Sequence, residues 1–240
     1  MAAPEGARVG VLGATGAVGT EAVALLSRSP AVAEVVALTR RARGPGGFPG
    51  AAEGRVAERV VTFGSLQPAD LAGLDAVVCC LGTTAADAGG AAQRHVIDHD
   101  YVLEAARLAR AEPRCQYFSL LTSAGASSKS LLSYPRTKGQ VEEGVEALGF
   151  PRTAVWRPGL LDRGDRARGV ERAGLALAGG VPVRSLAGAM VAELERQAAA
   201  APAPGASAAP ARDAFSDADI RRLARASGFE PASPASCAIV

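Results

Sequence analysis

Short apolar runs alternate along the chain with stretches in which apolar residues recur at helical spacing. Such runs predict strands, and the stretches between them predict helices. The run at 75–81 is almost unbroken, as expected for a central parallel strand covered on both faces. The alternation predicts an α/β fold with a doubly wound parallel sheet. Strands are expected at 9–12, 34–38, 59–63, 75–81, 116–121 and 153–156, and helices at 67–74, 95–110 and 134–148.

The last third of the chain predicts a small helical cap. Its helices are expected at 169–178 and 185–198. A further amphipathic helix at 216–226 would be capped by Ser216 and Asp219 and would either pack on the cap or bind a partner. The expected organisation is a sheet domain at 1–160, a cap at 161–197, a flexible Ala/Pro-rich linker at 198–212, and a helix with a tail at 213–240.

Three glycines at three-residue spacing, Gly13, Gly16 and Gly19, follow the first predicted strand. They suit a tight turn, close approach of a pyrophosphate to the backbone, and close packing of the next helix on the strand. The helix N-terminus would present N–H groups to the phosphates. This context favours a Rossmann-type dinucleotide site over a glycine-rich loop before an ordinary helix. The residues expected at the phosphates are Gly13, Thr15, Gly16, Ala17, Val18 and Gly19.

The end of the second predicted strand indicates which dinucleotide is preferred. An acidic residue there usually bonds the ribose 2′-hydroxyl of NAD, but this strand runs into Arg40 and Arg41. A guanidinium at this position can pair with a 2′-phosphate. We therefore predict NADP(H) as the cofactor, although both arginines would also suit the start of a solvated loop.

Two later strand ends are expected to border the same crevice. The strand at 75–81 ends where the order of strands reverses, so Leu81, Gly82 and Thr83 should face the cofactor. A plain polar turn is the alternative. The strand at 153–156 ends in Arg157, Pro158 and Gly159, whose backbone groups are expected at the nicotinamide, unless this break is a simple turn.

Tyr134 and Lys138 lie four residues apart in a predicted helix and therefore share a helix face. An ammonium beside a phenol stabilises the phenolate, which makes the phenol a usable general acid or base. The chain has only two lysines, so this pair is not an expected coincidence. Ser123, at the end of the preceding strand, is expected to bond a substrate carbonyl oxygen, with Thr122 as the alternative. The alternative interpretation is an ordinary helix on which Tyr134 and Lys138 are exposed and have no catalytic role.

Composition and termini bear on whether the chain binds nucleic acid or metal, forms disulfides, or carries a signal peptide or lipid. The chain has 240 residues and a net charge of +2, so no strong field indicates nucleic acid. Its four cysteines show no metal or disulfide spacing, and the early first strand leaves no room for a signal peptide. His95 and His99 have no third ligand in the sequence pattern and are predicted to be surface or capping residues. Cys237 starts a C-a-a-X ending that suits either prenylation or a free thiol.

Taken together, these motifs resemble the atypical short-chain dehydrogenase/reductases, and more specifically the HIV Tat-interacting-protein oxidoreductase family. The resemblance covers residues 9–197 and is most specific in the Cys-Cys-Leu-Gly-Thr-Thr run at 79–84. It implies strand order 3-2-1-4-5-6, NADPH binding and a cytoplasmic or nuclear location. Asp98 stands where many catalytic relatives carry Asn in a proton relay, and Thr62 where relatives often carry Asp at the adenine.

Two functions follow as hypotheses. The first is an NADPH-dependent carbonyl reductase. In it Tyr134 donates the proton, Lys138 lowers the pKa of Tyr134 and holds the nicotinamide ribose, so that both residues also border the cofactor, and Ser123 orients a small carbonyl substrate. The second is an NADPH-sensing regulatory or adaptor protein with a protein partner. A nucleotide-sugar epimerase is disfavoured by the short C-terminal region. We expect no metal and no nucleic-acid partner; a homodimer and membrane contact through the C-terminus stay open. The expected location is cytoplasmic, with the mitochondrial outer membrane or the nucleus as alternatives.

Overall fold

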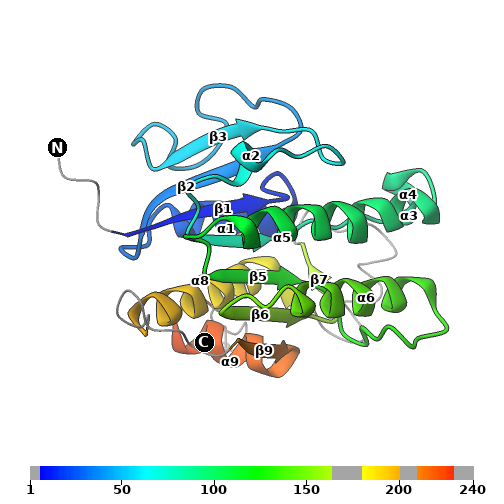
Figure 1. Cartoon of the computed structure of the whole chain (residues 1–240). Helices are drawn as coiled ribbons and strands as arrows, with labels where there is room; N and C mark the ends of the chain where they lie inside the picture. Colours follow the sequence, from blue (N-terminus) through cyan, green and yellow to red (C-terminus); the bar gives the residue numbers. More distant parts are fainter. Residues whose placement is uncertain (1–5, 164–179, 201–209, 230–240) are drawn as a thin grey trace, which may run out of the picture.

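A parallel sheet forms the centre of the computed structural model, which describes residues 6–163, 180–200 and 210–229. Its strands lie in the order β3-β2-β1-β4-β5-β6-β9, and each neighbouring pair is parallel (Figure 1). The predicted α/β class and strand order are confirmed, and β9 extends the sheet beyond β6. The strands are β1 (Ala7–Leu12), β2 (Val32–Thr39), β3 (Val56–Val60), β4 (Ala76–Cys79), β5 (Tyr117–Leu121), β6 (Arg152–Arg157) and β9 (Ala211–Ser216).

Helices cover both faces of the sheet, as the doubly wound fold requires. One apolar core joins the sheet to α1 (Ala17–Leu26), α8 (Val183–Ala199) and α9 (Asp217–Ala226). A second core joins the opposite face to α5 (Tyr101–Ala111) and α6 (Ser133–Ala147), which lie together in Figure 1. The remaining elements are α2 (Pro68–Leu71), α3 (Ala85–Ala88), α4 (Ala91–His95), the π-helix η1 (Val96–Asp100), and the short strands β7 (Leu161–Asp162) and β8 (Val181–Pro182).

The strand β9 is an element that the sequence pattern did not predict. Its residues are mostly exposed and lack alternation of apolar and polar positions, so the sequence pattern predicts the end of a linker and the start of a terminal segment there. Pairing with β6 and stacking of Phe215 on Trp156, with ring centres 4.2 Å apart, hold it in the sheet. Of the linker predicted at 198–212, residues 201–209 lie outside the described residues. The cap helix predicted at 169–178 lies wholly outside them.

The terminal helix α9 was predicted either to pack on the cap or to bind a partner, and the structure shows it packed. It begins after Ser216, whose side chain accepts a hydrogen bond from the Asp219 N–H, as the capping pattern predicted. Its apolar side, with Ile220 and Ala224 buried, packs in the core that also contains α8. Within the described part of the chain, no helix is long and apolar enough to cross a membrane.

The third strand lies earlier in the chain than predicted, at Val56–Val60 instead of 59–63. It is the edge of the sheet, where one side of the strand faces solvent and polar residues such as Glu58 are tolerated. Its last residue, Val60, is 55% exposed. The prediction was wrong because it looked for a run of apolar residues, which is typical of a buried strand and not of an edge strand.

Candidate functional site

The glycine turn joins β1 to α1 as predicted. Gly13 has a φ of +73°, and a Cβ there would lie 2.6 Å from the carbonyl oxygen of Cys80, so glycine is required on both counts. The N-cap of α1 is Gly16, and no side chain caps the helix. The first N–H groups of α1 therefore remain available to an anion.

Gly19 provides the first test of this turn. A Cβ at Gly19 would lie 2.1 Å from the backbone oxygen of Gly13, which no side-chain movement can relieve. We expect Gly19→Ala to push α1 off the turn, to cost about 1–3 kcal/mol of stability, and to weaken dinucleotide binding. Urea unfolding and calorimetric titration with NADPH measure the two effects. A variant with unchanged stability and affinity would show that this close approach is dispensable.

The end of β2 presents the two arginines expected at the 2′-phosphate. Arg40 and Arg41 are both exposed and form no ion pair within the described residues. The nearby Glu58 carboxylate instead accepts hydrogen bonds from the Thr39 hydroxyl, at 2.9 Å, and from the Arg43 N–H, at 3.0 Å. Glu58 thus fixes the chain on either side of the arginines, whose charges have no acidic partner in the described part of the chain.

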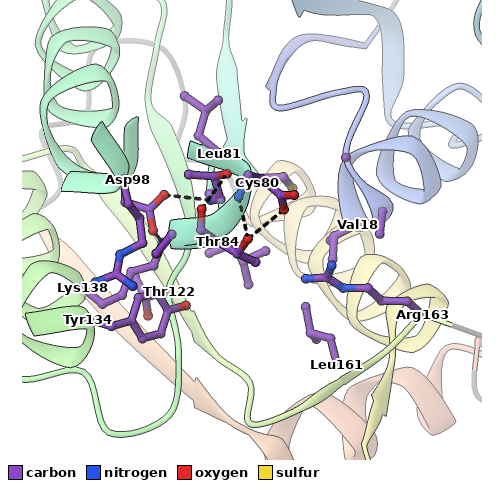
Figure 2. A pocket seen from close by; sticks show the side chains of 18 residues that line it. Val18, Cys80, Leu81, Thr84, Asp98, Thr122, Tyr134, Lys138, Leu161 and Arg163 are labelled. Atoms are coloured by element: carbon purple, nitrogen blue, oxygen red, sulfur yellow. Dashed lines mark hydrogen bonds and ion pairs between the residues drawn. The ribbon is translucent and has the colours of Figure 1, made fainter. Parts of the chain in front are cut away.

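A pocket of about 450 Å³ opens beside the carboxyl ends of β4 and β5, in the expected crevice. The α1 N-terminus with Val18 and the pair Tyr134 and Lys138 lie on opposite sides of it (Figure 2). Residues missed by sequence reasoning, including Cys80, Arg94 and Leu161, also line it. The predicted residues that line it are Gly16, Ala17, Val18, Leu81, Gly82, Thr83, Tyr134 and Lys138.

Tyr134 and Lys138 lie on the first two turns of α6. Tyr134 is 37% exposed, whereas the Lys138 side chain is 4% exposed. The Lys138 ammonium lies 5.8 Å from the centre of the Tyr134 ring, and the Arg94 guanidinium lies 5.2 Å from the same ring centre. The phenol therefore borders the pocket with two cationic groups beside its ring.

Asp98 gains a partner that the sequence did not reveal. Its Oδ2 lies 3.2 Å from the Lys138 ammonium, and its Oδ1 accepts a 2.9 Å hydrogen bond from the Thr83 N–H. The Asp98 side chain is 1% exposed, so this is a buried ion pair. It sits in the π-helical turn η1, a type of irregularity that often marks functional sites. Asp98 lies four residues before the buried Val102, so helical spacing places both on the inner face of the helix. This spacing is the signal from which the burial of Asp98 could have been predicted.

Ser123 and Thr122 differ in how their hydroxyls are engaged. Thr122 lines the pocket, but its Oγ1 lies 2.7 Å from a Glu142 carboxylate oxygen and 3.1 Å from the Trp156 carbonyl. Ser123 does not line the pocket, yet its Oγ is buried with no hydrogen-bond partner in the described residues. An unpaired buried hydroxyl is uncommon and requires an explanation such as a ligand. Ser123 therefore stays the predicted orienting hydroxyl.

The Arg-Pro-Gly segment, which begins at the last residue of β6, does not line the pocket. The Arg157 guanidinium forms an ion pair with the buried Glu142, to which Arg212 of β9 also bonds at 2.9 Å. The Pro158 carbonyl accepts from the Ala124 N–H, and the Gly159 N–H donates to Asp217 at 2.7 Å. These partners tie β5, β6, α6 and β9 together, and a cofactor role for this segment stays a prediction.

Cys79 is the last residue of β4 and Cys80 follows it, and the surroundings of both thiols disfavour the thiolate. Burial raises the pKa of Cys79 to about 11 and raises the pKa of the pocket-lining Cys80 further. Both thiols therefore stay protonated near neutral pH, and the thiolate is the reactive form. Cys237, at the proposed prenylation motif, lies outside the described residues.

The two histidines have a third neighbour that the sequence pattern did not reveal. His95 and His99 stack with ring centres 4.7 Å apart, and one potential ligand atom from each lies within 4.8 Å of Asp100. Each imidazole is also hydrogen-bonded, His95 to Thr137 at 3.2 Å and His99 to Asp100 at 2.8 Å. These bonds suit the predicted surface role, and the expectation that no metal binds stays a prediction.

Comparison with known proteins gives matches over much of the chain. Residues 8–117 match the family model described as the NAD binding domain of semialdehyde dehydrogenase. The chain is 37% identical over 159 residues to Protein fmp52, mitochondrial, of Emericella nidulans, covering 65% of this chain and 67% of the relative. It is 33% identical over 178 residues to fmp52-1 of Aspergillus terreus, with 72% and 75% covered. Protein HTATIP2 of Rattus norvegicus is 48% identical over 89 residues, with 37% and 36% covered.

Solved structures support the same fold. A Bacillus halodurans protein, provisionally assigned as an NAD-dependent epimerase/dehydratase, has a TM-score of 0.67 at 18% identity, covering 92% of this chain and all of that chain. The UDP-glucuronic acid 4-epimerase of Bacillus cereus in complex with NAD has a TM-score of 0.60 at 13% identity, with 94% and 91% covered. At these identities the likeness concerns the fold.

The names of the relatives correct one prediction. The fmp52 proteins of Emericella nidulans and of two Aspergillus species are named mitochondrial. The cytoplasmic location predicted from the sequence is therefore wrong. That prediction rested on the family resemblance and on the lack of room for a cleavable targeting peptide. The second is a weak guide because targeting signals do not always take the form of a cleavable peptide.

Proposed function

The chain belongs to the fmp52 family of atypical short-chain dehydrogenase/reductases, and we propose that it is an NADPH-dependent carbonyl reductase. The resemblance predicted from the sequence, including that to the HIV Tat-interacting-protein oxidoreductases, is confirmed. The family is one of NAD(P)-binding oxidoreductases. The choice of NADPH, the carbonyl substrate and catalysis by Tyr134 and Lys138 are our proposals.

One observation carries the proposal: Tyr134 and Lys138 face the glycine turn across a single pocket (Figure 2). The residues present fit a nicotinamide dinucleotide, because Gly16, Ala17 and Val18 at the α1 N-terminus line the pocket and no described side chain caps the N–H groups there. An anchored dinucleotide would thus extend from this turn toward Tyr134.

The roles of the side chains follow from their positions. When bound, NADPH supplies the hydride. The Tyr134 hydroxyl is the accessible acid of the pocket and donates the proton to the carbonyl oxygen. Asp98 holds the Lys138 ammonium in place beside Tyr134, within reach of a ribose. Orientation of the carbonyl by the Ser123 hydroxyl, which is buried next to the pocket-lining Thr122 with no hydrogen-bond partner among the described residues, is part of this proposal.

The preference for NADPH has its own test at Arg40. We expect Arg40→Ala to weaken NADPH binding by about tenfold, because one charge-assisted contact to the 2′-phosphate is lost, and to leave NADH binding unchanged. Calorimetric titration of both nucleotides measures this. Arg43→Ala is the matched control, since Arg43 lies in the same loop with its backbone held by Glu58. Equal weakening of both nucleotides would refute a 2′-phosphate contact.

A second function remains open because of an apolar surface beside the site. Leu131 is 95% exposed and Leu132 is 69% exposed, in the loop that leads into α6 just before Tyr134. Such side chains suit contact with a protein partner. An NADPH-sensing adaptor would use this surface, and its function would not require the Tyr134 hydroxyl.

A further inference from the structure

Among the described residues that line the pocket, basic side chains outnumber acidic ones. Its acidic residues are Asp87 and Asp98, and its basic residues are Arg94, Lys138 and Arg163. Asp98 is committed to Lys138, and Asp87 accepts a hydrogen bond from the Thr84 hydroxyl at 2.8 Å. Arg94 forms no ion pair with any described residue.

The contacts of Arg94 leave part of its guanidinium free. It donates one hydrogen bond, to the Ser133 hydroxyl at 3.1 Å, and its Cζ lies 5.2 Å from the centre of the Tyr134 ring. Arginine carries five N–H donors in a planar fork, and stacking on an aromatic ring uses none of them. These two contacts orient the fork and leave donors for a ligand.

The position of Arg94 separates it from the phosphate-binding part of the pocket. It lies on α4 against the Tyr134 ring, and Tyr134 lies across the pocket from Val18 at the α1 N-terminus (Figure 2). An anion at Arg94 would thus lie beside the residue that donates the proton. It would belong to the reacting molecule and not to the dinucleotide pyrophosphate.

We propose that Arg94 binds the carboxylate of the substrate, so that the carbonyl compound reduced here is an oxo acid. The fork of arginine matches a carboxylate with two parallel hydrogen bonds, which a neutral ester or amide cannot provide. Because Arg94 touches the Tyr134 ring, the carboxylate and the reacting carbonyl are separated by only a few bonds. The part of this inference that concerns reduction of an oxo acid rests on the proposed reductase function. The part that concerns carboxylate binding by Arg94 does not.

Binding can be tested without turnover. Calorimetric titration of the NADP⁺-saturated protein with malonate, and with the neutral malonamide, compares charged and uncharged probes of equal size. We expect malonate to bind the wild type, to bind Arg94→Met at least about tenfold more weakly, and to recover partly in Arg94→Lys. Arg107→Met is the matched control, because Arg107 is exposed on α5 and away from the pocket. Failure of malonate to bind, or equal binding by Arg94→Met, would overturn the proposal.

Turnover separates this inference from the proposed function. We expect pyruvate, acetoacetate or succinic semialdehyde to be reduced with a higher kcat/KM than its methyl ester, and Arg94→Met to remove that difference mainly through KM. Reduction of esters and acids alike, unaffected by Arg94→Met, would overturn the role of Arg94 and leave the reductase intact. Arg94-dependent malonate binding without reduction of any carbonyl would support the anion site and refute the reductase.

Discussion

Replacing Tyr134 with Phe is expected to lower the rate of carbonyl reduction by about 10²–10⁴-fold, because the general acid is lost. The ring would remain, so its packing against Arg94 should persist. NADPH affinity should change little, since Lys138 is held by Asp98 and not by the phenol. NADPH consumption measured by absorbance, together with calorimetric titration, gives both quantities.

Tyr101→Phe is the matched control for this substitution. Tyr101 stacks on Phe63 with ring centres 5.8 Å apart, on α5 and away from the pocket lining. We expect that variant to turn over at the wild-type rate. If Tyr134→Phe kept full activity, another group would donate the proton. If it lost activity and NADPH binding together, the phenol would be part of the nucleotide site instead.

Removal of the Asp98 carboxylate should have the largest effect on stability. Asp98→Ala would leave the Lys138 ammonium buried without a counter-charge and the Thr83 N–H without its acceptor. Loss of one partner of a buried ion pair costs about 3–5 kcal/mol. Urea unfolding of the wild type and the variant measures this difference in the free energy of unfolding.

Two further variants show whether the buried charge is the cause. Glu21→Ala removes one partner of the more exposed Arg184–Glu21 pair and should cost at most about 1 kcal/mol. Adding Lys138→Met to Asp98→Ala should restore part of the lost stability, because no unpaired charge remains. A loss no greater than that of Glu21→Ala would show that Asp98 and Lys138 do not form the pair described.

The fold could be predicted because its signals are local. The glycines after β1 and the unbroken apolar run of β4 each depend on a few neighbouring residues, and the helical spacing of Tyr134 and Lys138 is equally local. β9 escaped prediction because its place is set by a distant partner: the register with β6 and the stacking of Phe215 on Trp156. An exposed edge strand carries little pattern of its own.

The electrostatics of the site could not be predicted for a similar reason. Asp98 was read from the sequence as a departure from a proton relay, and only the π-helical turn that places it against Lys138 shows its charge pairing. Arg94 gave no signal among the many arginines of this chain. Arg94 is a candidate anion-binding residue because it has no carboxylate partner among the described residues. Only the folded pocket shows this.

Transfer of deuterium is the most direct test of the proposed reaction. The protein would be incubated with NADPH deuterated at the reactive C4 position and with the oxo acids and methyl esters named above, and the products would be analysed by mass spectrometry. We expect deuterium on the carbon of the new alcohol with the wild type, and an initial rate of deuterium transfer about 10²–10⁴-fold lower with Tyr134→Phe. NADPH binding without deuterium transfer to any of these carbonyl compounds would contradict the reductase and leave nucleotide sensing as the function of this fold.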